Sequence, residues 1–450
     1  MARRQARSRR RSPSGGGRIQ TRVLGRGLRL HVLTTDRFTT AACRVFLHRP
    51  LDAQTTATAV LAAVMRAATQ GYPTRRALSE RLADLYGASL SVGSATLGDR
   101  LVLSAGVEWP IGGVPGARGL LGQGLAVLGE VLARPRRGGD GALDTSIVRT
   151  ECTNHARALR ALRDDKGRYA LRRALQLACA GEPYAQGAEG RLEDLAAVTP
   201  GSLSRLHAHL LADAPAEIYV VGDVGADEAQ RAVQRHLLWQ GRSPRPAALP
   251  SPVGTCGGRA RSQRVAEPDS VAQGKLVLVF RAPVGASDPL APAAHTLAGV
   301  LGGGPFARLF KVVRETHGLC YYANAGWNEA KGLLVVQVGI DPRHEGRVTR
   351  LVQSLAAEVG RGVLEPEALQ GLRQAAAHRV ASLADNRGAR IGFDHESLAL
   401  GRERSPQRWL ARLMAVRPAE VRAVGRRLRL DTVFFLGGGA ASRARKGGGR

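Results

Sequence analysis

The two halves of the chain carry the same order of sequence patterns. In the first half, RRALSERLADLYG has helical periodicity and leads into the alternating stretch SLSVGSATLGDRLVLSAGV. In the second half, ARLFKVVRETHG leads in the same way into LCYYANAGWNEAKGLLVVQVGI, so that Gly87 matches Gly318. Farther along, VTPGSLSRLHAHLLADAPAEIYVVGDV matches VRPAEVRAVGRRLRLDTVFFLGGG, and Pro200 pairs with Pro418. This internal repeat predicts two similar domains in tandem.

The periodicity of each half also predicts its fold. The order in each half is strand, strand, helix, helix, hairpin, helix, long helix, helix, strand. Hairpin-connected strands with grouped helices are typical of a layered α+β fold. We therefore predict the α+β class, with two tandem homologous domains that each have a mostly antiparallel sheet and helices packed on one face.

Composition marks the boundaries of these domains. The segment 240–270 is rich in Pro, Gly and Ser, which predicts a linker. It separates an N-terminal domain at 19–239 from a C-terminal domain at 271–438. Arginines cluster at 1–18 and at 439–450, and we expect both segments to be disordered basic tails.

The charge and cysteine content narrow the possible classes of protein. A net charge of +29 suggests nucleic-acid binding, but only five of the 66 basic residues are Lys, which indicates a general preference for Arg. We therefore expect no specific nucleic-acid site, although the tails could hold an acidic surface or RNA loosely. No apolar run is long enough for a membrane span. Five scattered cysteines favour a reducing compartment, so we expect a cytoplasmic protein without disulfides.

Longer motifs carry a family resemblance. In the second half, LGGGPFARLFKVVRETHGLCYYANAGW resembles the C-terminal domain of the insulinase/pitrilysin family of zinc peptidases, with its Gly-rich turn, helix and R-E-x-x-G-L-x-Y motif. In the first half, TQGYPTRRALSERLADLYGASLSV, RDDKGRYALRRALQL and GEPYAQGAEG are similar to the bacterial YfmF group, which is associated with the 5-aminopentanol modification of elongation factor P. The resemblance implies an insulinase/mitochondrial processing peptidase-like fold over roughly residues 20–438.

The zinc motif of this family is missing from the chain. The resemblance implies that H-x-x-E-H, in which two His bind zinc and the Glu activates water, aligns with the segment from Val60 to Val64, with Ala63 at the base position. The third ligand aligns with Ala158. Val and Ala cannot bind a metal or move a proton, and residues 51–110 contain no His. We therefore expect no metal in this chain and no peptidase activity on its own.

Other potential ligands do not form a recognisable site. Glu151 stands where the family often keeps a second acidic residue, and Cys152 and His155 follow it on the long helix. A lone Cys/His pair at this spacing is weak evidence for zinc. His207 and His209 are two residues apart on a predicted helix, so we expect them to point to different faces and to be solvated.

The R-E-x-x-G-L-x-Y motif is the remaining candidate for chemistry. The resemblance implies that its Arg and Tyr, here Arg314 and Tyr321, reach across a chamber to orient a substrate carbonyl and stabilise the oxyanion. Gly318 suits a helix C-cap, and Tyr321 and Tyr322 should face opposite sides of the following strand. The alternative is structural: an Arg in a last helical turn interacts favourably with the helix dipole and can pair with a nearby acid.

These observations leave two hypotheses about function. The resemblance implies that zinc-less members pair with zinc-bearing ones, so we expect a non-catalytic subunit of a heterodimeric peptidase, with zinc in the partner and a peptide or protein substrate bound partly by strand addition. The glycine turn would then border the substrate; its residues are Gly302, Gly303 and Gly304. The alternative is a non-proteolytic scaffold or maturation factor that docks on an acidic protein partner, such as elongation factor P or its modifying enzymes.

Overall fold

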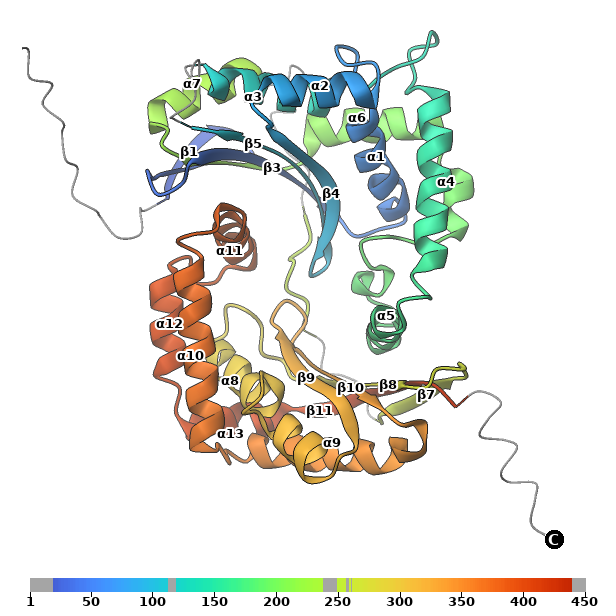
Figure 1. The fold of residues 1–450 in the computed structure, drawn as a ribbon, viewed down its shortest axis with the longest axis vertical. Coiled ribbons are helices and arrows are strands. Elements are labelled where there is room, and N and C mark those ends of the chain that lie inside the picture. The colour runs from blue at the N-terminus through green and yellow to red at the C-terminus, as the bar shows by residue number, and fades with distance from the viewer. Residues whose placement is uncertain (1–18, 112–118, 238–248, 256–258, 260, 439–450) are drawn as a thin grey trace, which may run out of the picture.

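The computed structural model consists of two α/β layers that face one another (Figure 1). The described residues are 19–111, 119–237, 249–255, 259 and 261–438. Both predicted tails and part of the predicted linker lie outside them.

The first layer is built on a six-stranded sheet with the order β1-β2-β6-β3-β5-β4. Its strands are β1 Gln20–Gly25, β2 Leu28–Thr34, β3 Thr40–Pro50, β4 Ser89–Leu97, β5 Arg100–Pro110 and β6 Ala216–Gly222. All neighbouring strands are antiparallel except β2 and β6. Every residue of β6 is buried, as expected for a central strand that is covered on both faces.

The second layer is built on a five-stranded sheet with the order β7-β11-β8-β10-β9. Its strands are β7 Gln263–Glu267, β8 Gly274–Arg281, β9 Cys320–Asn328, β10 Leu333–Ile340 and β11 Arg429–Leu436. Here β7 and β11 form the parallel pair. The predicted linker at 240–270 was therefore too long, because 263–267 already belong to this sheet. As a half-exposed edge strand, β7 needs no continuous apolar run, and its sequence QRVAE gave no strand signal.

Each half of the chain supplies its own set of helices, most of which cover the outer face of its sheet (Figure 1). In the first layer they are α1 Thr55–Ala67, α2 Arg75–Asp84, α3 Leu120–Ala133, α4 Thr145–Ala161, α5 Lys166–Ala178, α6 Pro200–Asp213 and α7 Ala226–His236, with short 3₁₀ turns at Pro183–Gln186 and Glu193–Ala197. In the second they are α8 Ala291–Gly302, η3 Leu309–Thr316, α9 Glu345–Gly360, α10 Pro366–Ser382, α11 Arg387–Leu400, α12 Pro406–Met414 and α13 Pro418–Arg427, with a 3₁₀ turn at Pro342–His344.

The internal repeat is present in the structure at the level of single residues. Gly87 and Gly318 both follow a helix and both have positive φ, at 76° and 61°. Such angles are easily reached only by Gly. Pro200 and Pro418 are each the first residue of a helix, α6 and α13, that leads into a central strand. The predicted α+β class with two tandem homologous domains is confirmed.

The prediction of helices on one face only is incomplete, because the halves exchange a helix. The small residues Ala170, Ala174 and Ala178 of α5 pack on Val279 and Phe434 in the inner face of the second sheet. The equivalent helix α11 lies against the inner face of the first sheet (Figure 1). There its Ile391 contacts a cluster of apolar side chains: Leu33, Ala42, Phe46, Val102, Tyr219 and Val221. Each sheet is thus buried on its second face by the other half of the chain.

Candidate functional site

Arg314 lies on the helical segment that connects α8 to β9. This segment, η3, is wound as a π-helix and ends just before Gly318, whose N–H donates to the carbonyl of Arg314 at 3.0 Å. The Arg314 side chain is exposed, and its Cζ lies 4.7 Å from the ring centroid of Phe310. Arg314 has no ion-pair partner among the described residues, so the pairing with a nearby acid that a structural role suggests is not observed.

Tyr321 occupies a bulge in the edge strand β9. Tyr322 pairs with Gly339 and Cys320 with Ile340, which leaves Tyr321 as the extra residue. Bulges of this kind re-aim a side chain and are common beside active sites. The Tyr321 side chain is 61 % exposed, whereas Tyr322 is half-buried, with Lys275 Nζ 5.2 Å from its ring centroid. The two tyrosines therefore differ as expected, one packed and one open.

The glycine turn before η3 has a structural reason at two of its three positions. A Cβ on Gly302 would lie 2.4 Å from the backbone nitrogen of Ala325 in β9, and one on Gly303 would lie 2.6 Å from the carbonyl oxygen of Gly299. Gly302 therefore allows the end of α8 to sit close to β9, and Gly303 allows the chain to turn closely against the last turn of α8. At Gly304 a Cβ would meet open space. A role of the three glycines in substrate binding stays a prediction.

Two of the positions that match the lost zinc motif lie in an apolar environment. Val60 and Val64 of α1 are buried in the hydrophobic core of the first layer. Ala63 is half-buried, and Ala158 of α4 is exposed. Among the described residues, no group of three or more His, Cys, Asp or Glu side chains is arranged to hold a metal ion.

The polar residues on α4 are each bound to a different partner. The buried Glu151 forms an ion pair with Arg75 of α2, and His155 Nε2 lies 2.8 Å from the carbonyl oxygen of Glu189. Burial raises the pKa of the Cys152 thiol, which disfavours the thiolate that a metal needs. These three residues therefore do not converge on one site.

The expectation of a solvated His207–His209 pair is wrong for His207. Its ring is buried, and Nε2 lies 2.7 Å from the carbonyl oxygen of Leu132 in α3. Periodicity cannot reveal this contact, because it depends on α3 packing beside α6. His209 is exposed and pairs with Asp213 at 2.7 Å.

The edge of the first sheet borders a groove that the sequence did not indicate. A cavity of about 390 Å³ lies between β4 and α5 and is lined by residues of both, including Ala95, Thr96, Leu171 and Leu175. In the sheet order β4 pairs only with β5, so its other edge is free. An extended peptide can use such an edge for main-chain hydrogen bonds.

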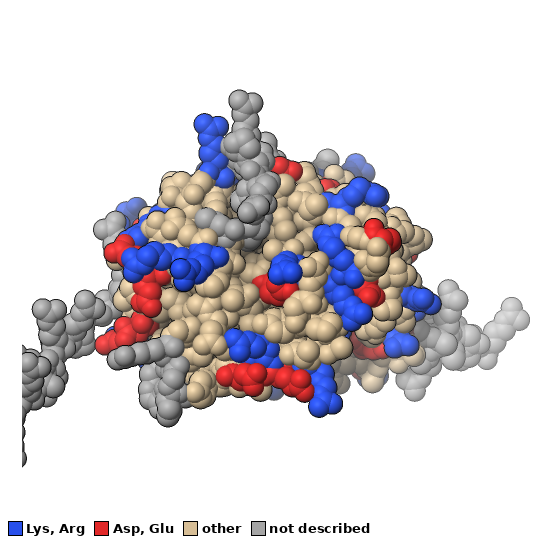
Figure 2. All heavy atoms as spheres, turned by 90° about the horizontal axis from the view of Figure 1, so that it is seen from above, with Lys and Arg blue, Asp and Glu red and all other residues tan. Residues whose placement is uncertain are grey.

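The outer surface over the first layer carries charges of both signs. On the face above α2, α3 and α7, basic and acidic side chains alternate over the described residues (Figure 2), a pattern that does not favour nucleic-acid binding there. Four cysteines are free, namely Cys43, Cys152, Cys179 and Cys320. In the described part of the chain, no helix has both the length and the apolar character to span a membrane.

Comparison with known proteins supports the family resemblance. Residues 197–375 match the model of the Peptidase M16 inactive domain. The probable inactive metalloprotease YmfF of Bacillus subtilis is 26 % identical over 419 residues, which cover 92 % of this chain and 96 % of YmfF. The chain thus contains a segment that matches the M16 inactive domain, and it resembles YmfF over most of its length. An uncharacterized zinc protease of Mycobacterium bovis is 28 % identical over 275 residues, 60 % of this chain and 62 % of that protein.

Solved structures agree with this assignment. A conserved protein from Enterococcus faecalis superimposes on this M16 homologue with a TM-score of 0.85 and 25 % identity, over 93 % of this chain and 98 % of that one. An M16 inactive domain from Pseudomonas fluorescens has the same fold, with a TM-score of 0.74 and 17 % identity over 93 % of this chain and 98 % of that one. The resemblance inferred from the motifs is confirmed, and the chain is a homologue of inactive M16 metalloproteases.

The apolar zinc-motif positions lead to a direct prediction. Purified protein should contain far less than one zinc per chain after dialysis against a chelator, and it should cleave no peptide, because Val60, Val64 and Ala158 offer no ligand. Metal analysis and a peptide-library assay measure both quantities. About one zinc per chain, lost together with a peptidase activity, would contradict it.

Proposed function

We propose that this M16 homologue is the non-catalytic subunit of a heterodimeric zinc peptidase. The observation that carries the proposal is the contrast between the zinc-motif positions of this chain and its R-E-x-x-G-L-x-Y motif. Its own zinc positions are apolar, whereas Arg314 and Tyr321 are both exposed, form no side-chain hydrogen bond or ion pair among the described residues, and lie on either side of Gly318. Two exposed polar side chains of this kind are suited to donate hydrogen bonds to a group that another molecule supplies.

In this proposal the partner supplies the zinc, and this chain supplies two hydrogen-bond donors. The guanidinium of Arg314 and the phenol of Tyr321 can both donate hydrogen bonds to an oxygen that becomes negative in the transition state. The position of Tyr321 in a bulge supports this role. As the extra residue, Tyr321 has no pairing partner in β10, and a bulge changes the direction of its side chain. The free edge of β4 and the groove beside α5 would hold an extended segment of the substrate.

The experiment compares three variants in a co-expressed complex with a zinc-bearing M16 homologue. Arg314→Ala and Tyr321→Phe should leave the melting temperature and complex formation unchanged, because both side chains are exposed. The kcat of the complex should fall about tenfold in each, less than the 100- to 1000-fold typical of a rigid oxyanion donor, because both side chains are exposed rather than fixed in a buried site. Tyr322→Phe is the matched control: it removes the same hydroxyl from the neighbouring half-buried position and should leave kcat unchanged.

Two outcomes would contradict the proposal. One is a zinc-bearing homologue that is fully active alone and does not co-elute with this chain. The other is an assembled complex whose kcat is unaffected by both Arg314→Ala and Tyr321→Phe. Either result would favour the scaffold function, in which the basic chain docks on an acidic protein.

The cellular setting forms part of the same proposal. The similarity of the first half to the YfmF group supports a role near the 5-aminopentanol modification of elongation factor P, in the cytoplasm. Deleting the gene and measuring the mass of elongation factor P tests this link. An unchanged mass distribution would separate the peptidase complex from that modification.

A further inference from the structure

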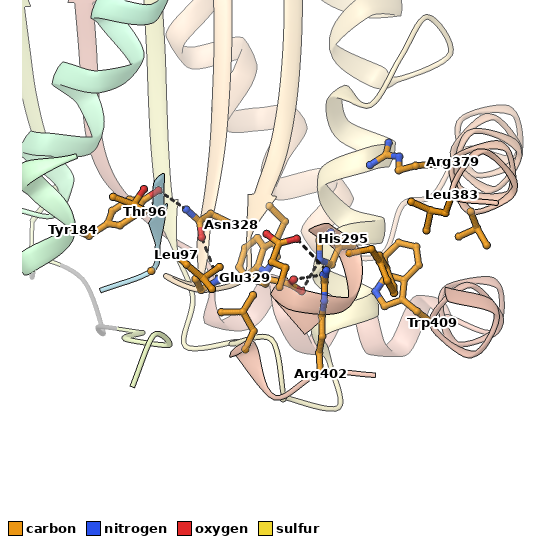
Figure 3. Close-up of a pocket in the computed structure, with 17 residues that line it drawn as sticks. Thr96, Leu97, Tyr184, His295, Asn328, Glu329, Arg379, Leu383, Arg402 and Trp409 are labelled. Atoms are coloured by element: carbon orange, nitrogen blue, oxygen red, sulfur yellow. Dashed lines mark hydrogen bonds and ion pairs between the residues drawn. The ribbon is translucent and has the colours of Figure 1, made fainter. Parts of the chain in front are cut away.

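A second cavity, remote in sequence from the zinc motif, lies where the two halves meet. Its volume is about 520 Å³, and it is lined by the tip of the β4–β5 hairpin together with residues of α8, β9, α10, α11 and α12 (Figure 3). Volumes of this size are typical of small-molecule sites. Aromatic residues make up only 4 % of the chain, yet four of the lining residues are aromatic: Tyr184, Trp327, Phe393 and Trp409.

The floor of this cavity is formed by polar side chains that pair with one another. Glu329 is buried and lies between His295, at 3.1 Å from Nε2, and the guanidinium of Arg402 (Figure 3). Arg402 also donates from Nε to the hydroxyl of Ser397 at 2.9 Å. Glu329 and Arg402 thus satisfy each other and form a rigid base, so the floor leaves little capacity for a charged ligand.

Two other charges on the walls are accessible to a ligand, because both side chains are exposed. The Glu396 side chain of α11 is half exposed and pairs with Arg402 at 3.2 Å, a cation that it shares with Glu329. Burial raises the pKa of Glu396, as expected for a carboxylate whose charge is incompletely balanced. Arg379 of α10 has no ion-pair partner among the described residues. It lies apart from the Glu329 group, on the side of Leu383 and Trp409 (Figure 3).

We propose that this cavity binds a short peptide with free termini, its ammonium group at Glu396, its carboxylate at Arg379 and its apolar side chains against Trp409, Leu383 and the other apolar walls. The two exposed charges have opposite sign and come from different helices of a cavity that also has apolar walls, which matches a zwitterion with an apolar body. Polyanions are disfavoured by the two carboxylates, and a lipid chain by the charged floor. The site is separate from Arg314 and Tyr321, and it lies wholly within this chain.

The test uses the isolated full-length chain and the tripeptide Leu-Phe-Leu in four forms: free, N-acetylated, C-amidated and doubly blocked. Isothermal titration calorimetry should show that the free form binds, and that acetylation or amidation each weakens binding about tenfold, near the lower end of the effect of one hydrogen bond to a charged group. In Glu396→Gln, acetylation should no longer matter while amidation still does. In Arg379→Gln the pattern should be reversed.

Matched controls remove the same charges elsewhere on the second half. Glu367→Gln and Arg412→Gln lie outside the cavity and should bind all four peptides as the unmodified chain does. Arg314→Ala should also bind normally, so a failure of this site is distinct from a failure of the peptidase proposal. No binding of the free tripeptide up to about 10 mM, or blocking effects that persist in both cavity variants, would overturn the inference.

Discussion

Glu182→Ala is expected to lower the free energy of unfolding by about 3 kcal/mol, the lower end of the range for removing one partner of a buried ion pair. Glu182 follows α5 in the first half and joins two buried cations of the second half. Its carboxylate lies 2.5 Å from Arg281 and 2.8 Å from Lys331. The Arg281 and Lys331 side chains are only 2 % and 1 % exposed, so neither can recover its lost partner from water.

The remaining partners explain why the effect should not be larger. Lys331 keeps Asp99 at 2.8 Å, and Arg281 keeps Asp431 at 3.3 Å. Burial by itself raises the pKa of Glu182, but the contacts with Lys331 and Arg281 outweigh it and hold that pKa below its ordinary value. The carboxylate is therefore charged at neutral pH and binds the two halves together.

Urea unfolding at pH 7, followed by circular dichroism and tryptophan fluorescence, measures this effect. The variant should also show two separated transitions, because Glu182 links the halves. Glu193→Ala, an exposed glutamate on the next turn of the chain, is the control and should change stability by less than about 0.5 kcal/mol. A loss below about 1 kcal/mol for Glu182→Ala would show that the remaining pairs alone hold the two cations.

Acidification from pH 7 to pH 4 is expected to destabilise the contact between α11 and the first sheet by on the order of 6 kcal/mol, about 3 kcal/mol for each of two histidines. His48 of β3 and His395 of α11 are both buried, and their Nε2 atoms lie 3.1 Å apart. Burial lowers the pKa of His48 to about 4. Burial, together with the neighbouring His48, lowers the pKa of His395 to about 3.

The sign of this dependence follows from proton binding. Between the folded pKa values and the unfolded value of about 6.5, the unfolded chain binds protons that the folded chain does not. The stability is therefore complete above pH 6.5, and it declines as the pH falls toward 4. Protonating both rings would place two positive charges in contact under α11, so the two halves should separate first.

The double variant His48→Gln/His395→Gln isolates the contribution of this pair. Its free energy of unfolding should depend less steeply on pH between 7 and 4, even if it starts from a lower value. His378→Gln, an exposed position on α10, should keep the original slope. Equal slopes in the unmodified chain and the double variant would assign the acid sensitivity to carboxylates instead.

The sequence by itself determined the repeated architecture and the loss of the zinc set. Strand and helix periods report which face of an element is apolar, and the order of these elements was sufficient for the α+β class. Gly87 and Gly318 could be placed as helix ends because their backbone angle is set locally. Val60 and Ala63 needed no structure either, because an apolar side chain cannot bind a metal in any fold.

Only the tertiary structure decided which surfaces meet. The period of α5 shows an alanine face, but not that the sheet of the other half covers it. His207 is buried because α3 lies beside α6, and β7 is a strand because β11 supplies its hydrogen bonds. The cavity between the halves depends on Glu396 and Arg379 approaching it from different helices. Such contacts join residues far apart in the chain, and their energy comes from a partner that local periodicity does not encode.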